Sequence, residues 1–114
     1  MSIKQDLKRI AVDLELRASE YAASRRRLAI ISVRFGVEYA KSYASTDCSL
    51  KIDDRKALAT IATEHICTEK SVLEAETDVL KLSIKVLENT LSDTQTLASL
   101  IKTEEQIERG FGKL

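Results

Sequence analysis

The chain has 114 residues, with 18 Lys or Arg, 18 Asp or Glu and a formal net charge of zero. This balance argues against a protein that coats nucleic acid by bulk attraction, because such proteins depend on many cationic contacts with phosphates. With no proline, three glycines and 4% aromatic residues, the composition predicts long helices and almost no strand. No apolar run approaches the ~20 residues that span a bilayer, and residues 1–6 carry charges where a signal peptide has its apolar core. We therefore expect a cytoplasmic protein with a single helical domain, residues 1–114.

The first predicted helix runs from about residue 3 to residue 44. Apolar residues recur there at heptad spacing, with interruptions at Arg17 and Ser24. They are Ile3, Leu7, Ile10, Leu14, Tyr21, Leu28, Ile31 and Phe35. This spacing is typical of a helix that packs against another helix. The β-branched run at residues 30–33 is also compatible with a strand. However, the sequence has no second segment with a comparable strand pattern that could pair with it.

The second half of this helix is apolar on two sides. A second stripe, roughly opposite the first, contains Ile30, Val33, Val37, Ala40 and Ala44. One helical hairpin cannot cover both sides, so we expect the second set of neighbours to come from other subunits of a homo-oligomer. The expected interface residues are Leu28, Ile30, Ile31, Val33, Phe35 and Val37.

A loop is predicted at residues 45–53, where the heptad pattern stops. Asp53 suits the N-cap of the next helix, and Asp54 is favourably placed against its dipole. Arg109 in the last turn and Gly110 just beyond it predict where that helix ends.

The second helix is therefore predicted at about residues 54–109. Its seam alternates steps of four and three and comprises Leu73, Thr77, Leu80, Ile84, Leu87, Leu91, Thr94, Ala98 and Ile101. The seam shifts near residues 68–71, which leaves open whether the helix bends there. The two long helices are expected to pack antiparallel and to assemble into a symmetric, ring-like oligomer.

A basic cluster on the first helix is the strongest candidate site. Its members are Arg25, Arg26, Arg27, Arg34 and Lys41, and four of the five aromatic residues, Tyr21, Phe35, Tyr39 and Tyr43, lie on the same segment. Cations beside aromatic rings suit single-stranded nucleic acid, because phosphates attract cations and unpaired bases stack on rings. The alternative is a solvated stripe whose charges pair with Glu20, Glu38 or acids of a neighbouring chain, the aromatic rings being part of the core.

Catalytic and metal-binding chemistry is not predicted. Glu69 follows His65 by four residues, but one histidine with scattered carboxylates is a weak metal signal. Cys67 is two residues from His65 on a helix and faces away from it, and the chain has no glycine-rich phosphate loop. We therefore expect no enzyme, no cofactor and no bound metal, and we expect Cys48 and Cys67 to be free thiols.

The sequence resembles the UvsY-like recombination mediator proteins of tailed phages. The resemblance rests on Arg34, Lys41 and Tyr43 near the end of the first helix, on residues 75–81 (Ala-Glu-Thr-Asp-Val-Leu-Lys), and on the Arg-Gly-Phe motif at residues 109–111. It implies a small helical protein that forms a ring-like oligomer, binds single-stranded DNA and helps load a RecA-like recombinase onto strands covered by single-strand-binding protein. DNA contacts carried over from the family fall chiefly on Arg34 and Lys41.

The functional prediction is thus a recombination mediator in the cytoplasm of the phage-infected host. Its DNA-binding residues are expected to be Arg25, Arg26, Arg27, Arg34, Lys41 and Tyr43. The alternative, from a different class, is a structural or assembly chaperone protein that binds partner helices and no nucleic acid.

Overall fold

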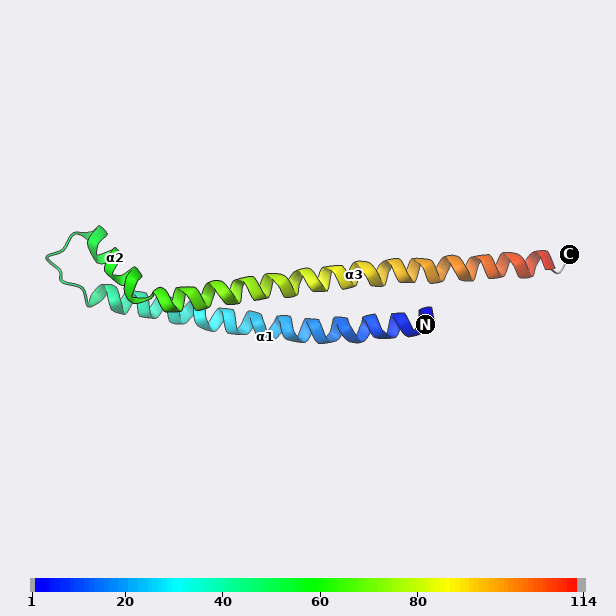
Figure 1. Cartoon of the computed structure of the whole chain (residues 1–114), viewed down its shortest axis with the longest axis horizontal. Coiled ribbons are helices and arrows are strands. Elements are labelled where there is room, and N and C mark those ends of the chain that lie inside the picture. The colour runs from blue at the N-terminus through cyan, green and yellow to red at the C-terminus, as the bar shows by residue number, and fades with distance from the viewer. Residues whose placement is uncertain (1, 113–114) are drawn as a thin grey trace. The chain divides into compact units, whose positions relative to one another are not determined.

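The structure is a computed structural model that describes residues 2–112, with side chains described to residue 110. Over these residues it contains three α-helices, α1 (Ile3–Ala44), α2 (Ile52–Ala62) and α3 (Glu64–Gly112), and no strand (Figure 1). The all-α prediction is confirmed, and residues 30–33 belong to α1. The side chain of Phe111, part of the Arg-Gly-Phe motif, lies outside the described side chains.

Helix α1 has the bounds predicted from the sequence, and a capping box fixes its start. The backbone N–H of Gln5 donates to Ser2 Oγ at 3.2 Å, and the backbone N–H of Ser2 donates to Gln5 Oε1 at 3.3 Å. This reciprocal pair satisfies two donors that would otherwise lack partners at a helix N-terminus.

The loop is shorter than predicted, because α2 begins at Ile52. The N-cap position falls on Lys51, which is extended (φ −63°, ψ 152°) and makes no side-chain capping bond. The prediction of Asp53 as the N-cap was therefore wrong, although Asp53 and Asp54 do lie in the first turn, where their charges favour the helix dipole. Within the loop, the Ser49 N–H donates to Asp47 Oδ1 at 2.9 Å, which lowers the pKa of Asp47.

Arg55 ties α2 to the end of α1. Its Nε donates to Thr46 Oγ1 at 2.7 Å, its Nη2 donates to the Tyr43 carbonyl at 3.3 Å, and its guanidinium lies 4.3 Å from the centre of the Tyr43 ring. A planar guanidinium makes these contacts together, whereas an ammonium cannot. The sequence reasoning did not single out Arg55.

We expect Arg55→Lys to loosen the loop without unfolding the helices. Hydrogen bonds from a charged donor contribute about 1.5–3 kcal/mol, so amide hydrogens of residues 45–51 should exchange faster while those of α1 keep their protection. Lys56→Ala, at the exposed neighbouring position, is the control and should leave the exchange unchanged. Equal exchange in all three proteins would mean that Arg55 does not hold the loop.

The predicted second helix is divided at Thr63, which corrects the single helix at residues 54–109. Thr63 Oγ1 donates to the Ala59 carbonyl at 2.8 Å, and Thr63 has φ −108° and ψ 9°. The Thr63 backbone N–H bonds to the carbonyls of both Ala59 and Thr60, at 3.2 and 3.3 Å, so α2 ends in a tightened turn that contains no proline or glycine. Helix α3 is continuous through residues 68–71, where the seam shifts in the sequence.

Helix α3 ends later than predicted, at Gly112 rather than near Arg109. No described glycine has a positive φ, so Gly110 continues the helix instead of terminating it. The predicted seam is confirmed from Leu73 to Ala98, where Leu73, Leu80, Ile84, Leu87, Leu91, Thr94 and Ala98 are half-buried and Thr77 is buried. Its last member, Ile101, is exposed, so the seam ends earlier than predicted. From Ser99 to Gly110 every side chain is exposed.

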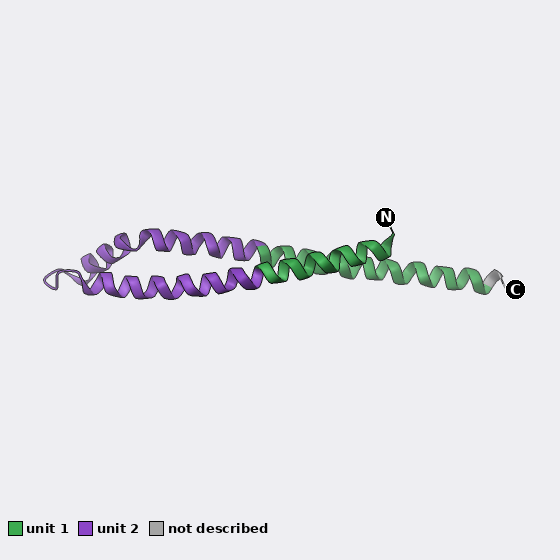
Figure 2. Ribbon diagram, turned by 90° about the horizontal axis from the view of Figure 1, so that it is seen from below, with its two compact units in different colours: residues 1–20, 80–114 green, residues 21–79 purple. Residues whose placement is uncertain are grey.

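The chain divides into two compact units, where the sequence predicted one domain (Figure 2). Unit 1 combines residues 1–20 with residues 80–114, and its α1 segment buries Ile10. Unit 2 comprises residues 21–79 and contains the loop, α2 and every predicted binding residue. In unit 2 the segments of α1 and α3 lie side by side.

Candidate nucleic-acid and helix-binding surfaces

A hydrogen-bonded pair of polar side chains lies between α1 and α3 in unit 2. Ser24 is 2% exposed, and its Oγ lies 2.7 Å from Thr77 Oγ1 on α3. Because the Thr77 hydroxyl donates to the Leu73 carbonyl at 2.6 Å, Ser24 is the donor in the Ser24–Thr77 bond. Ser24, which interrupts the apolar pattern in the sequence, is therefore a buried member of the seam with a satisfied hydroxyl.

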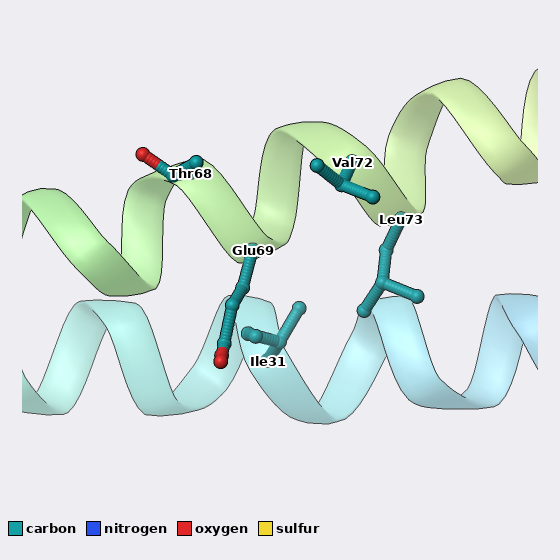
Figure 3. Close-up of a pocket in the computed structure, with 5 residues that line it drawn as sticks. All are labelled: Ile31, Thr68, Glu69, Val72 and Leu73. Atoms are coloured by element: carbon teal, nitrogen blue, oxygen red, sulfur yellow. The ribbon is translucent and has the colours of Figure 1, made fainter.

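Apolar packing continues along the same side of α1. Ile31 lies in a groove with Leu73 and the side chain of Glu69, while Val72 lines the outer side of this groove (Figure 3). Phe35 lines a second hollow with Ile61 and Cys67. Lys70 Nζ lies 5.4 Å from the centre of the Phe35 ring. The seam of α1 is thus covered within the chain.

The six predicted interface residues fall into two groups. Leu28 and Phe35 are half-buried and Ile31 is buried on the side of α1 that packs within the chain, so these three contribute to intramolecular packing. Ile30, Val33 and Val37 are 63%, 68% and 47% exposed. Only this second group, on the other stripe, presents an apolar surface that the described chain leaves uncovered.

Two of the predicted DNA-binding cations have carboxylate neighbours within their own chain. Arg34 Nη1 lies 3.9 Å from Glu69 Oε2 on α3, and Lys41 Nζ lies 4.0 Å from Glu38 Oε1 on the preceding turn of α1. All four side chains are substantially exposed, and exposed ion pairs of this kind contribute only about 0–1 kcal/mol. A phosphate can compete for either cation.

Arg25, Arg26 and Arg27 are exposed, and we call them the arginine triplet. Within the described residues, no carboxylate lies within 4 Å of any of them. The Arg25 guanidinium lies 5.8 Å from the centre of the Tyr21 ring. The triplet therefore carries three charges that have no carboxylate partner among the described residues.

The aromatic rings are less available than the sequence suggested. Tyr43 is half-buried beneath the Arg55 guanidinium, and Phe35 and Tyr39 contact each other with ring centres 6.1 Å apart. A base cannot stack on the face of Tyr43 that Arg55 covers. The ring of Tyr43 therefore packs against Arg55 beside the loop.

Helix α3 carries an exposed apolar row that the sequence reasoning missed. Val72 and Val79 are 53% and 64% exposed, and both lie in unit 2. The signal was their seven-residue spacing, which places them in one line beside Glu69 and Glu76. In the sequence this line is obscured by the stronger buried seam that runs next to it.

The remaining candidate chemistry does not come together. Within the described residues the structure contains no cluster of three His, Cys, Asp or Glu side chains that would hold a metal ion. Cys48 and Cys67 are both free and exposed. No helix in the described part of the chain is long and apolar enough to cross a membrane. Comparisons with protein-family models, curated proteins and solved structures found no match for this chain.

Proposed function

We propose that this chain is a recombination mediator that binds single-stranded DNA and helps load a RecA-like recombinase onto strands covered by single-strand-binding protein. The observation that carries the proposal is the arginine triplet, which is exposed and has no carboxylate within 4 Å among the described residues. Phosphates of a single strand would supply the missing counter-charge. Arg34 and Lys41, to which the family resemblance points, would join once a phosphate displaces their weakly held carboxylates.

In this proposal the protein works as a homo-oligomer in the cytoplasm of the phage-infected host. Its long helices form an antiparallel hairpin, and copies assemble into a ring-like particle through the exposed stripe of Ile30, Val33 and Val37. An apolar stripe of this kind is typical of a surface that another helix covers. An oligomer would also place several arginine triplets along one strand, which raises its affinity through multivalency.

The second candidate is an assembly protein that binds partner helices and no nucleic acid. Two observations favour it: Arg34 and Lys41 lie beside carboxylates of their own chain, and exposed apolar rows run along both α1 and α3. Under this alternative the basic residues serve solubility and helix pairing only.

The salt dependence of DNA binding separates the two candidates. For Arg25→Ala and Arg26→Ala we expect weaker binding to labelled oligo-dT, with the slope of log affinity against log salt reduced by about 0.7 per lost phosphate contact. The measurement is fluorescence anisotropy at several salt concentrations, with Lys56→Ala on α2 as the control that removes one exposed cation elsewhere. Arg34→Ala and Lys41→Ala should change the slope less, because their cations have partners without DNA.

Absence of binding at low salt by the wild-type protein would reject the mediator and leave the assembly protein. An unchanged slope in both triplet variants, with binding retained, would mean that DNA contacts another surface.

A further inference from the structure

One face of unit 2 carries a row of basic residues on α1 and a row of acidic residues on α3. Arg27, Arg34 and Lys41 follow one another at seven-residue intervals on α1, while Glu69 and Glu76 do so on α3. We call these the basic row and the acidic row. Each has an exposed apolar neighbour row, Ile30 and Val37 beside the basic one and Val72 and Val79 beside the acidic one.

The Arg34–Glu69 contact shows that both rows lie on the same side of the helix pair. It also shows that Arg34 and Glu69 occupy the same level along the helix axes. Its two charged atoms are 3.9 Å apart. Glu69 and Val72 both line the groove above Ile31, and Figure 3 shows Glu69 reaching from α3 toward α1 beside Ile31. The two rows and their apolar neighbours thus form one continuous face.

One heptad away, the same face carries charges without partners. Arg27 and Glu76 occupy positions equivalent to Arg34 and Glu69, yet within the described residues neither has an ion pair within 4 Å. The described part of the chain thus leaves a cation and a carboxylate unpaired there, next to the exposed side chains of Ile30 and Val79. A partner for this face must therefore be apolar and must carry both charges in the opposite arrangement.

We propose that a second copy of the chain covers this face, related by a two-fold axis parallel to the helix pair. Rotation about that axis places α1 of each copy over α3 of the other. Each residue keeps its level along the helix axes. The basic row of one copy then meets the acidic row of its partner, Arg34 opposite Glu69 and Arg27 opposite Glu76.

The charges select this axis over its alternative. A two-fold axis in the same interface but perpendicular to the helices would lay α1 over α1, with Arg27 facing Lys41 and basic row against basic row. Like charges in contact disfavour that arrangement. Burial of the apolar side chains of Ile30, Val37, Val72 and Val79 makes association favourable. The basic and acidic rows determine how the two copies are oriented.

This inference rests on the homo-oligomer of the proposed function and specifies one of its contacts. It assigns Arg27 and Arg34 to the contact between copies, in place of the phosphate contacts proposed for them above. Arg25 and Arg26 stay outside this contact, free for phosphates. A ring built on such pairs contains an even number of chains, because every copy uses this face once.

Charge inversion followed by mixing tests the proposal. Arg34→Glu and Glu69→Arg each place like charges at positions 34 and 69, so by sedimentation velocity each variant should self-associate at least about tenfold more weakly than the wild type. In an equimolar mixture of the two variants, both cross-copy pairs become opposite in charge, and association should return. The double variant Arg34→Glu/Glu69→Arg should also associate, since its rows are merely exchanged.

Restored association in the mixture supports the contact between copies, because a pair acting only within one chain cannot be repaired by mixing. A mixture as weakly associated as its components, with helix content retained by circular dichroism, overturns the proposal. If a single charge variant does not fold, Val79→Ser replaces it. Val79→Ser should weaken self-association whereas Ile52→Ser, equally exposed on α2, should not, and equal effects overturn the proposal.

The outcomes for the two proposals are distinguishable. A wild-type monomer at micromolar concentration overturns this contact together with the homo-oligomer. Loss of DNA binding in the triplet variants, measured separately, has no bearing on how the copies associate.

Discussion

Truncation of Ile31 to alanine is expected to lower the free energy of unfolding by about 2–5 kcal/mol. Ile31 is 8% exposed and fills the space between α1 and α3, so the change removes apolar contacts and leaves a cavity that rigid helices fill only in part. Ile30→Ala is a matched control, because it makes the same chemical change one residue earlier at an exposed position.

Urea unfolding followed by circular dichroism measures the difference between these variants. Association contributes to the apparent stability of an oligomer, so the comparison is made at several protein concentrations. Ile31→Ala should lower stability at every concentration, whereas Ile30→Ala should act mainly by weakening association. Similar losses at low concentration would show that Ile31 is not the intramolecular core residue described above.

Thr77→Val is expected to cost about 1–3 kcal/mol, because it leaves the buried Ser24 hydroxyl without its acceptor. Valine keeps the shape of threonine, so the loss reports on hydrogen bonding rather than on volume. The double variant Ser24→Ala/Thr77→Val removes both polar groups and should recover most of that loss. A double-mutant cycle measured by urea unfolding gives the coupling free energy.

A coupling near zero would mean that the Ser24–Thr77 bond adds nothing beyond the bond from Thr77 to the Leu73 carbonyl. A clear coupling would make this pair a register marker for the seam, since a shift of either helix by one turn separates the two hydroxyls. Polar residues in otherwise apolar seams are known to fix register in this way at some cost in stability.

Periodicity made the helices and the buried side of α3 predictable. Local spacing was enough to predict the bounds of α1 and the burial of the seam from Leu73 to Ala98. A heptad pattern predicts which side of a helix packs against another helix. The division at Thr63 was not predictable in the same way. The Thr63 hydroxyl bonds to the previous turn, but Thr60 and Thr68 make the same bond without interrupting their helices, so residue type alone does not locate the division.

The candidate site was predictable as a set of residues but not as a set of contacts. Spacing placed Arg34 and Lys41 on one stripe, yet the carboxylate beside Arg34 belongs to Glu69, on a helix far along the sequence. Ser24 appeared as an interruption for the same reason, since its partner lies 53 residues away. Pairings across helices depend on register, which a single helix pattern does not reveal.

The loop held by Arg55 has a kinetic consequence for unit 2. The bond from Arg55 to the Tyr43 carbonyl joins residues only 12 apart, whereas the Ser24–Thr77 bond joins residues 53 apart. Closing the short loop first costs the least chain entropy, and each later contact then closes only a small additional loop. We therefore expect assembly of the helix pair to start at the loop and to advance toward Ser24. In stopped-flow measurements, variants at Arg55 should change the folding rate, and variants at Ser24 or Thr77 should change mainly the unfolding rate.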